Sequence, residues 1–356
     1  MNFGVGIVGL GRIGRGVLRN NFTQAVGGRF DIKVVCDVMP INQVAYLLSH
    51  DSTYGNPPFS ITIDGEHLIV DGKPIKYQRV DRRRGNPQDA GLGDLREFEL
   101  DVLFDATGTA TNDDFRTIIR QNIAKKTLCT WNVTGLDISL VYGVNNDQYD
   151  PTKHDVICSS TCTGNALTPI FHILEQHIGI DYARVITIHP TLSDQKVLDG
   201  YHVNPQYGRT FNESIIPTST NVGHSTTLVI PALTGKIDSF SYRVPNCIVS
   251  AMDISARLAR NTTIEECSDL FNHYAQNSLN GIISCDYGSF GHQKVSIDYL
   301  KTPYSAVILM QYLTAHGCQL GLSLMHDNEW AYCCRVLDIL GVLSSAKEKH
   351  SCARNS

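Results

Sequence analysis

Residues 3–14 read FGVGIVGLGRIG, an apolar run that leads directly into a cluster of glycines. The apolar part, residues 3–8, has the composition of a buried parallel strand. The part that follows, GLGRIG at residues 9–14, matches the pattern G-x-G-x-x-G, which carries information only after a strand and before a helix. The surrounding sequence satisfies both conditions. The stretch therefore predicts the first strand-turn-helix unit of a dinucleotide-binding sheet.

The three glycines of this motif have separate roles in binding a cofactor. Gly9 permits the tight turn, Gly11 lets the backbone approach a pyrophosphate, and Gly14 allows close packing of helix on strand. Asp37 ends a second apolar run, residues 32–37, where a carboxylate would accept hydrogen bonds from the adenosine ribose and repel a 2′-phosphate. This favours NAD over NADP. The alternatives are a glycine turn that binds nothing and a solvated carboxylate at a strand end.

The first half of the chain continues to alternate short strands with helices, as a parallel sheet requires. Residues 60–77, SITIDGEHLIVDGKPIKY, alternate with period two around two Asp-Gly turns, which predicts an antiparallel excursion from the main sheet. The apolar run at 102–106 ends in Thr107 and Gly108 and precedes a helical pattern. This is another β-turn-α unit, and we expect Thr107 and Gly108 at the cofactor site.

The length of 356 residues favours two domains over one core. After about residue 150 the strand-like runs become longer, which indicates a mixed sheet. We predict an α/β protein with a Rossmann dinucleotide-binding domain and an α+β catalytic domain. The first domain would span residues 1–161, completed by a C-terminal helix at 327–356, and the second residues 162–326.

Composition excludes several classes of function. The net charge is −5, and the one basic run, Arg82 to Arg84, is too short to indicate a nucleic-acid or membrane surface. No transmembrane span or signal peptide is readable. The eleven cysteines lack zinc-type Cys-x-x-Cys pairs, so we expect reduced thiols and no metal site. A cytoplasmic protein that acts on small molecules is the expectation.

One cysteine lies in a sequence context that suggests catalysis. Residues 159–165 read SSTCTGN, and a helical pattern begins near Thr163, so the Cys162 sulfur would feel the positive end of a helix dipole, which favours thiolate. A nucleophilic thiol needs a base. His189 ends the apolar strand ARVITIHP at 183–190 and is the candidate. An inert buried cysteine and a structural histidine remain open on these features alone.

Several motifs, taken together and in order, resemble the phosphorylating glyceraldehyde-3-phosphate dehydrogenase family. The resemblance runs from one end of the chain to the other. The motifs that carry it are GLGRIG at 9–14, YLLSHDSTYG at 46–55, SSTCTGN at 159–165, His189, RVPNCIVSAMDIS at 243–255 and DNEWAYCCRVLD at 327–338.

The resemblance implies a mechanism and an assembly. In such enzymes, usually homotetramers, Cys162 would attack an aldehyde to give a thiohemiacetal, which passes hydride to NAD and becomes a thioester. His189 would be the general base and would hydrogen-bond the developing oxyanion. Asn328 matches the residue that fixes the nicotinamide carboxamide. Further family cofactor positions are matched by Arg12, Ile13 and Tyr332.

The two phosphate sites of the family depart from their usual sequence here. Leu192 stands where the family has a threonine, Tyr207 where it has an arginine, and Asn221 follows Thr220 where the family has a glycine. Arg243 is retained and is expected to bind phosphate. The resemblance thus gives the following expected contacts to substrate or inorganic phosphate: Thr161, Thr163, Thr220, Asn221 and Arg243.

Three functions remain open at this point. The first is oxidation of a small phosphorylated sugar aldehyde, with phosphorolysis of the thioester to an acyl phosphate. The second is an erythrose-4-phosphate dehydrogenase-like or specialised aldehyde dehydrogenase that hydrolyses the thioester. That branch shares a Tyr-His pair, matched by Tyr201 and His202, but keeps the arginine that is Tyr207 here. The third is a non-catalytic NAD-binding regulatory paralogue.

Overall fold

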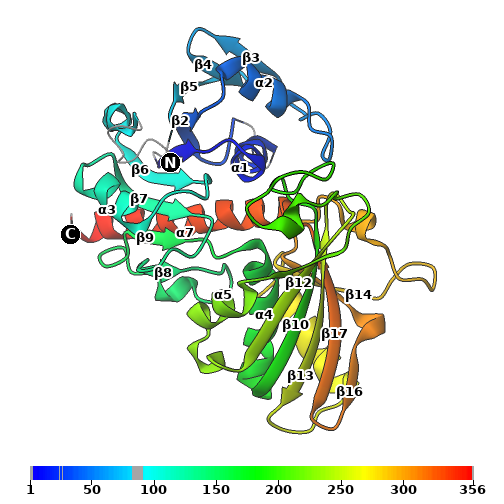
Figure 1. Ribbon diagram of the computed structural model, residues 1–356. Helices are drawn as coiled ribbons and strands as arrows, with labels where there is room; N and C mark the ends of the chain where they lie inside the picture. The colour runs from blue at the N-terminus through cyan, green and yellow to red at the C-terminus, as the bar shows by residue number, and fades with distance from the viewer. Residues whose placement is uncertain (1–2, 24, 26, 82–90, 355–356) are drawn as a thin grey trace. The chain divides into compact units, whose positions relative to one another are not determined.

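The computed structural model describes residues 3–23, 25, 27–81 and 91–354 (Figure 1). Arg82 to Arg84 lie outside the described residues. The chain divides into two compact units. The first comprises Met1–Leu140, Asn145–Ser160 and Cys333–Ser356, and the second Val141–Val144 and Thr161–Tyr332. Each unit is built on its own sheet.

The first unit contains a mainly parallel sheet in the order β3-β4-β5-β2-β1-β6-β7-β9-β8. The central strand β1 is buried throughout, as its glycine and β-branched composition predicts. The strands described in this unit are β1 (Gly4–Val8), β2 (Asp31–Asp37), β3 (Ile61–Asp64), β4 (His67–Val70), β5 (Lys73–Arg79), β6 (Leu100–Asp105), β7 (Ala124–Cys129), β8 (Ile138–Ser139) and β9 (Val156–Cys158).

Two predictions about this sheet are confirmed. The order on either side of β1 is that of a doubly wound Rossmann sheet, because the chain crosses from β2 to the other side of β1 at β6. The strands β3, β4 and β5 pair antiparallel around the two Asp-Gly turns, and β5 returns to pair in parallel with β2. The helices of this unit are α1 (Arg12–Thr23), α2 (Ile41–Ser49) and α3 (Asn112–Arg120).

The C-terminal helix α7 (Trp330–Arg354) joins the first unit from Cys333 onward and is drawn in red in Figure 1. Side chains from along the helix hold it there. Asp338 pairs with Arg29 at 2.9 Å, and Lys347 pairs with the buried Asp101 on β6 at 2.8 Å. Packing is close at Gly16, where a Cβ atom would lie 2.6 Å from the Cys333 sulfur.

The second unit contains a sheet in the order β11-β12-β10-β13-β17-β15-β14, with β16 paired to β17. β10 pairs in parallel with β12 and antiparallel with β13, so the predicted mixed sheet is confirmed. The strands described in this unit are β10 (Ile180–Pro190), β11 (Ile216–Ser219), β12 (Ile237–Val244), β13 (Ser250–Leu258), β14 (Ile283–Asp286), β15 (Ala306–Leu309), β16 (Thr314–His316) and β17 (Gln319–His326).

Helix α4 (Cys162–His177) covers one face of the central strands and forms the core of this unit. Its Leu167, Ile170 and Phe171 are fully buried against residues that alternate along β10, β13 and β17. The other helices are α5 (Val222–Val229) and α6 (Ile264–Gln276). In the part of the chain that the structure describes, no helix is long and apolar enough to cross a membrane.

Candidate active site

A cavity of about 260 Å³ opens beside the glycine turn of the first unit. Its lining includes Gly9 and Gly11 from the turn, Asp37 from the end of β2, and Thr107 and Thr109 from the loop after β6. These segments all follow the carboxyl ends of parallel strands, which is where open α/β sheets bind their ligands. The sequence-predicted residues Gly9, Gly11, Asp37 and Thr107 therefore lie around one cavity.

The geometry of the glycine turn separates the roles of its three glycines. Gly9 has φ of +90°, and a Cβ atom on Gly14 would lie only 1.8 Å from the Gly9 carbonyl oxygen. Both positions therefore require glycine for the fold itself. A Cβ atom on Gly11 would meet nothing within 4 Å. Since the protein does not need a glycine at this position, its open side is free for a ligand to approach the backbone closely.

Asp37 organises the turn as well as facing the cavity. Its Oδ2 accepts a hydrogen bond from the Leu10 N–H at 2.5 Å, and its Oδ1 accepts one from the Met39 N–H at 3.0 Å. Each carboxylate oxygen has a second lone pair, so both can still accept a ribose hydroxyl. The sequence predicted only that Asp37 binds the ribose. It could not predict the hydrogen bond to Leu10, because the two residues are 27 positions apart and no local pattern encodes their contact.

Several of the other residues predicted to contact the cofactor in this unit already make bonds within the protein. The Arg12 guanidinium pairs with Asp51 at 2.9 Å, so its charge is already balanced within the protein. Any contact of Arg12 with a cofactor would therefore depend on its position at the start of α1 rather than on its charge. The Ile13 carbonyl accepts a bond from the Cys333 thiol at 3.6 Å. Thr107 donates its hydroxyl to Asp105 at 2.6 Å, and Gly108 turns the chain with φ of +69°.

These features fit a dinucleotide. The start of α1 presents backbone N–H groups to an anion, and the glycine turn admits a pyrophosphate. Asp37 offers acceptors to a ribose diol at the edge of the same cavity.

In the second unit, Cys162 is the first residue of α4, so the helix begins one residue earlier than the sequence predicts. Thr161 is the N-cap, and its Oγ1 accepts the Gly164 N–H at 3.0 Å. The same hydroxyl lies 3.3 Å from the Thr163 Oγ1 and donates a hydrogen bond to the Ser225 Oγ on α5 at 3.4 Å. Thr161, Cys162 and Thr163 are therefore held in one fixed turn.

The ionisation of Cys162 differs from the sequence prediction. Burial raises the pKa of the Cys162 thiol to about 11, and the charge of Glu329 acts in the same direction. Backbone N–H groups at the start of α4 lower the pKa of Cys162, but by less than burial raises it. The expected preference for thiolate is wrong, because the N–H groups at the start of the helix do not offset the loss of solvent around the sulfur. A reaction at the Cys162 sulfur would therefore require a base to accept the thiol proton.

His189 has the properties of such a base. Its Nδ1 lies 2.8 Å from the Pro190 carbonyl oxygen, which as an acceptor requires the proton on Nδ1 and leaves Nε2 able to accept one. Burial lowers the pKa of His189, and the charge of Arg243, its partner across the β10–β12 pair, lowers it further. His189 is therefore neutral near pH 7.

Asn328 is fixed by an unusual piece of backbone. Its Oδ1 accepts the Val249 N–H at 3.1 Å, and Val249 has φ of +69°, a conformation that β-branched residues strongly disfavour. The bond orients the Asn328 amide and leaves its N–H₂ group to serve as a donor. Tyr332, four residues further along the chain, is buried.

Arg243 is held by two neighbours that the sequence did not link to it. Its Nη1 donates to the Asp194 Oδ1 at 2.6 Å, and its guanidinium carbon lies 4.2 Å from the centre of the Tyr207 ring. The Tyr207 hydroxyl is hydrogen-bonded to Thr218 on β11. The retained arginine thus has its charge balanced by a carboxylate and one face covered by an aromatic ring.

The other side chains expected to bind phosphate are less well placed to do so than the sequence suggested. Thr220 Oγ1 accepts the Val222 N–H at 3.4 Å and so helps to begin α5. Asn221 is exposed at the N-cap of α5, and its side chain makes no capping bond. Leu192, which stands where the resembled family has a threonine, is 39% exposed and presents an alkyl group to solvent.

Sequence reasoning missed two residues near His189. Asp194, five residues after His189, contributes to its electrostatics and neutralises Arg243. His326, at the end of β17, is buried and interacts electrostatically with His189. The motif DNEW begins one residue after His326, and this proximity was the only signal that could have drawn attention to it.

Comparison with protein-family models gives two matches to this chain. The model for the glyceraldehyde 3-phosphate dehydrogenase NAD binding domain matches residues 3–113. The model for the C-terminal domain of glyceraldehyde 3-phosphate dehydrogenase matches residues 161–321. The first matched region contains the cavity beside the glycine turn, and the second contains both Cys162 and His189.

Three relatives match this chain over nearly their whole length. The glyceraldehyde-3-phosphate dehydrogenase of Geobacillus stearothermophilus is 32% identical over 344 residues, covering 96% of this chain and 98% of the relative. Glyceraldehyde-3-phosphate dehydrogenase 2 of Bacillus subtilis is 31% identical, covering 99% and 100%. Glyceraldehyde-3-phosphate dehydrogenase 2 of Streptomyces avermitilis is 34% identical, covering 95% and 98%.

Proposed function

Because this chain belongs to the glyceraldehyde 3-phosphate dehydrogenase family, we propose that it oxidises a small phosphorylated sugar aldehyde through a thioester on Cys162. As a member of this family it is an NAD-dependent oxidoreductase with a Rossmann domain and an α+β domain. The assignment of individual residues to catalysis and binding is part of the proposal. We assign NAD binding to residues 1–161 with the helix at 327–356, and catalysis to residues 162–326.

NAD, when bound, supplies the acceptor for the hydride. The start of α1 and the turn at Gly9, Gly11 and Gly14 would hold its pyrophosphate, and Asp37 its adenosine ribose. The Asn328 amide, oriented by its bond to Val249, would donate to the nicotinamide carboxamide. Contacts from Arg12, Ile13, Thr107, Gly108 and Tyr332 complete the proposed set.

The chemical step begins at Cys162. The Cys162 sulfur attacks the aldehyde carbon as the thiol proton passes to His189 Nε2. The resulting imidazolium hydrogen-bonds the developing oxyanion and gives it this proton, so a thiohemiacetal forms and His189 is neutral again. His189 then takes the hydroxyl proton as the hydride leaves the same carbon, and a thioester remains on Cys162. The single observation that carries this proposal is the Nδ1 to Pro190 bond of a neutral His189, which leaves Nε2 as the proton acceptor.

Release of the product from Cys162 requires a second reactant. We propose that inorganic phosphate attacks the thioester carbon, so that the acyl phosphate leaves and Cys162 regains its proton from His189. Arg243 is the cation in the second unit that best supports an anion near His189, since the two residues are partners across β10 and β12. The remaining hydroxyl contacts would come from Thr161, Thr163 and Thr220, with Asn221 beside them.

Hydrolysis of the thioester is a second candidate that one observation favours. Tyr207 covers Arg243 at the position where a second cation is expected for the attacking phosphate, and its hydroxyl is engaged by Thr218. A site with one arginine that is already paired to Asp194 supports one anion better than two. Water would then attack the thioester, as in an erythrose-4-phosphate dehydrogenase-like or specialised enzyme.

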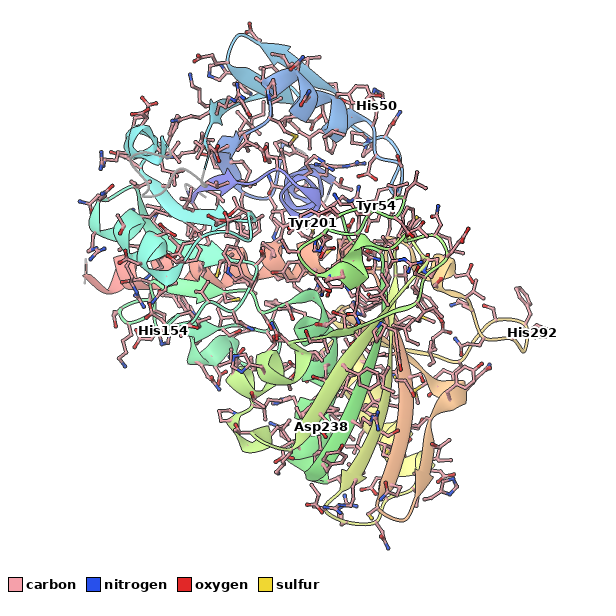
Figure 2. The ribbon with its side chains drawn as sticks, viewed as in Figure 1. His50, Tyr54, His154, Tyr201, Asp238 and His292 are labelled. Atoms are coloured by element: carbon pink, nitrogen blue, oxygen red, sulfur yellow. The ribbon has the colours of Figure 1, made fainter. Side chains whose placement is uncertain are left out.

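We also propose that the protein is a cytoplasmic homotetramer, and one exposed apolar loop supports association between copies of the chain. Val197, Leu198, Tyr201 and Val203 are 64%, 77%, 86% and 84% exposed, and Tyr201 is labelled in Figure 2. A monomer rarely leaves so many neighbouring apolar side chains in water. Sedimentation of the purified protein would report a tetramer if this loop is buried between subunits.

The test of function is NADH formation by the purified protein with glyceraldehyde 3-phosphate and with erythrose 4-phosphate, each with and without added phosphate. Phosphate-dependent turnover of the triose supports the first candidate. Turnover of either aldehyde without phosphate supports hydrolysis. No turnover of either, with NAD binding intact, would favour another aldehyde or a non-catalytic NAD-binding paralogue.

A further inference from the structure

Three neighbouring strands of the second unit place His189, Ser250 and His326 in one row. Ile188 pairs with Ala251 in the antiparallel β10–β13 ladder, so His189 lies opposite Ser250, and Ser250 pairs directly with His326 on β17. Directly opposite residues on antiparallel strands point to the same face of a sheet. This face is the buried one, because Met252 and Leu324, two positions along their strands, belong to the core under α4.

The row contains polar groups that have no partner in the protein. Ser250 and His326 are 0% and 1% exposed, and Thr187, two residues before His189 on the same face of β10, is also fully buried. Among the residues that the structure describes, nothing hydrogen-bonds the Thr187 Oγ1, the Ser250 Oγ or the His326 Nε2. An isolated buried polar atom is strongly unfavourable, and three of them around one histidine indicate a bound polar molecule.

We propose that Thr187, Ser250 and His326 bind buried water beside His189, and that His326 is a positioning residue which acts on His189 through this water. The functional half of this inference rests on the proposed role of His189 as general base. The binding half does not, because it follows from the orphaned atoms alone.

The chemistry of the three groups selects water as the ligand. Each hydroxyl can donate and accept, and an imidazole nitrogen offers one further bond, which matches the two to four bonds that a buried water makes. A charged ligand is disfavoured because no charged side chain completes the row. Burial and the charge of His189 lower the pKa of His326 to about 3, so His326 is neutral and balances no anion.

The charged and titratable groups around His189 determine how this water could affect the protonation of His189. Arg243 on β12 disfavours protonated His189, while Asp194 in the loop after β10 favours it. Neutral His326 lies on β17, and Asp327, which follows it, accepts backbone N–H bonds from Lys301, Glu329 and Trp330. Cys162, at the start of α4, is the proposed proton donor. A water oxygen turned toward His189 would stabilise the imidazolium that forms when the thiol proton arrives.

Thermal unfolding of single variants tests the water site without any assay of activity. Thr187→Val keeps the shape of the side chain and removes its hydroxyl, and Ser250→Ala does the same at the second position. If the hydroxyls bind water, both variants lower the Tm. Thr226→Val is the control: it should also lower the Tm, because the buried Thr226 hydroxyl accepts a hydrogen bond from Thr168. If the hydroxyls are truly unpaired, removing them leaves the Tm unchanged or raises it, and the proposal is overturned.

The pH dependence of His189 tests the role of His326. Loss of the water in His326→Phe removes a group that favours the imidazolium, so the pKa of His189 falls and the acid limb of kcat/KM moves to lower pH. We expect a shift of about one pH unit and a fall in kcat of about tenfold, with KM unchanged, because one pKa unit is a factor of ten. His326→Gln, which keeps a polar group, should restore part of both.

An unmoved acid limb in His326→Phe would overturn the positioning role, since a merely structural histidine would change the Tm but not the titration of His189. The same titration can be followed by NMR of labelled imidazole in the Cys162→Ser variant, which needs no substrate. Absence of turnover with every aldehyde tried would therefore count against the proposed function, while the NMR shift and the Tm series would still decide the water site.

Discussion

The guanidinium of Arg243 stacks on Tyr207, with 4.2 Å between the guanidinium carbon and the ring centre. The same guanidinium donates to Asp194 at 2.6 Å. These two contacts fix the arginine from two sides and balance its charge. A phosphate that binds Arg243 must therefore compete with a carboxylate that is already in place.

Asp194→Asn is expected to strengthen binding of a phosphorylated aldehyde. The variant removes the competing charge but keeps the size of the side chain. Because Asp194 is 42% exposed, its pairing is screened and worth about 0.2–1 kcal/mol, so we expect KM for glyceraldehyde 3-phosphate to fall by up to about fivefold. Unphosphorylated glyceraldehyde is the control, and its kinetics should change little. An increase in KM for the phosphorylated substrate alone would show that Asp194 orients Arg243 rather than competing for it.

Cys162→Ser and His189→Asn should separate chemistry from cofactor binding. The serine variant should abolish NADH formation while the affinity for NAD, measured by fluorescence titration, remains unchanged. His189→Asn should slow the reaction by about two to four orders of magnitude, the usual contribution of a positioned acid-base group. Comparable turnover in the serine variant would exclude the thioester, and a loss below about tenfold in the asparagine variant would assign proton transfer to another group.

Alkylation of Cys162 reports its ionisation directly. Since the pKa of Cys162 is raised to about 11, the thiol is protonated at neutral pH, and only the small thiolate fraction reacts. In the ligand-free protein, the rate of labelling by iodoacetamide should rise about tenfold per pH unit above pH 7. Mass spectrometry of the peptide that contains Cys162 would separate it from the other cysteines. Rapid labelling that is independent of pH near 7 would instead indicate a thiolate and imidazolium pair with His189.

Gly11→Ala and Gly14→Ala form a matched pair on the glycine turn. A Cβ atom at Gly14 would lie 1.8 Å from the Gly9 carbonyl oxygen, so the variant should destabilise the protein by about 1–3 kcal/mol or more. A Cβ atom at Gly11 meets nothing in the protein. Gly11→Ala should therefore keep its Tm but weaken NAD binding by about tenfold or more, because the methyl group enters the space of the ligand. Equal loss of stability in both variants would refute this division of roles, and calorimetry measures both quantities.

The Rossmann half could be predicted from sequence because its signals are local. The apolar strand before GLGRIG, the two Asp-Gly turns around β4, and Asp37 at the end of β2 are each decided within a few residues. The N-cap at Thr161 is local too, and the start of α4 was predicted to within one residue. Such features depend on backbone sterics and turn chemistry, which neighbouring residues determine.

What the sequence did not predict depends on contacts between distant segments. Tyr207 reaches Arg243 across 36 positions of chain, and the ionisation of Cys162 depends on how deeply α4 is buried. No local pattern encodes burial of a single sulfur, so the helix-dipole argument considered only one of the two opposing effects. His326 is similar, since its row with Ser250 and His189 exists only after three strands pair.

The bond between Asn328 and Val249 should couple the two residues energetically. Val249 is held at φ of +69°, and its N–H donates to the Asn328 Oδ1 at 3.1 Å. Asn328→Ala removes this restraint and should lower stability by about 1–3 kcal/mol, because a buried N–H loses its acceptor beside a strained residue. Glycine adopts positive φ without strain, so the same change should be less harmful in a Val249→Gly background. A double-mutant cycle by chemical denaturation should give a coupling of about 0.5–3 kcal/mol. Additive effects would mean that the hydrogen bond does not maintain the backbone at Val249, and that the buried Asn328 is fixed by its other surroundings.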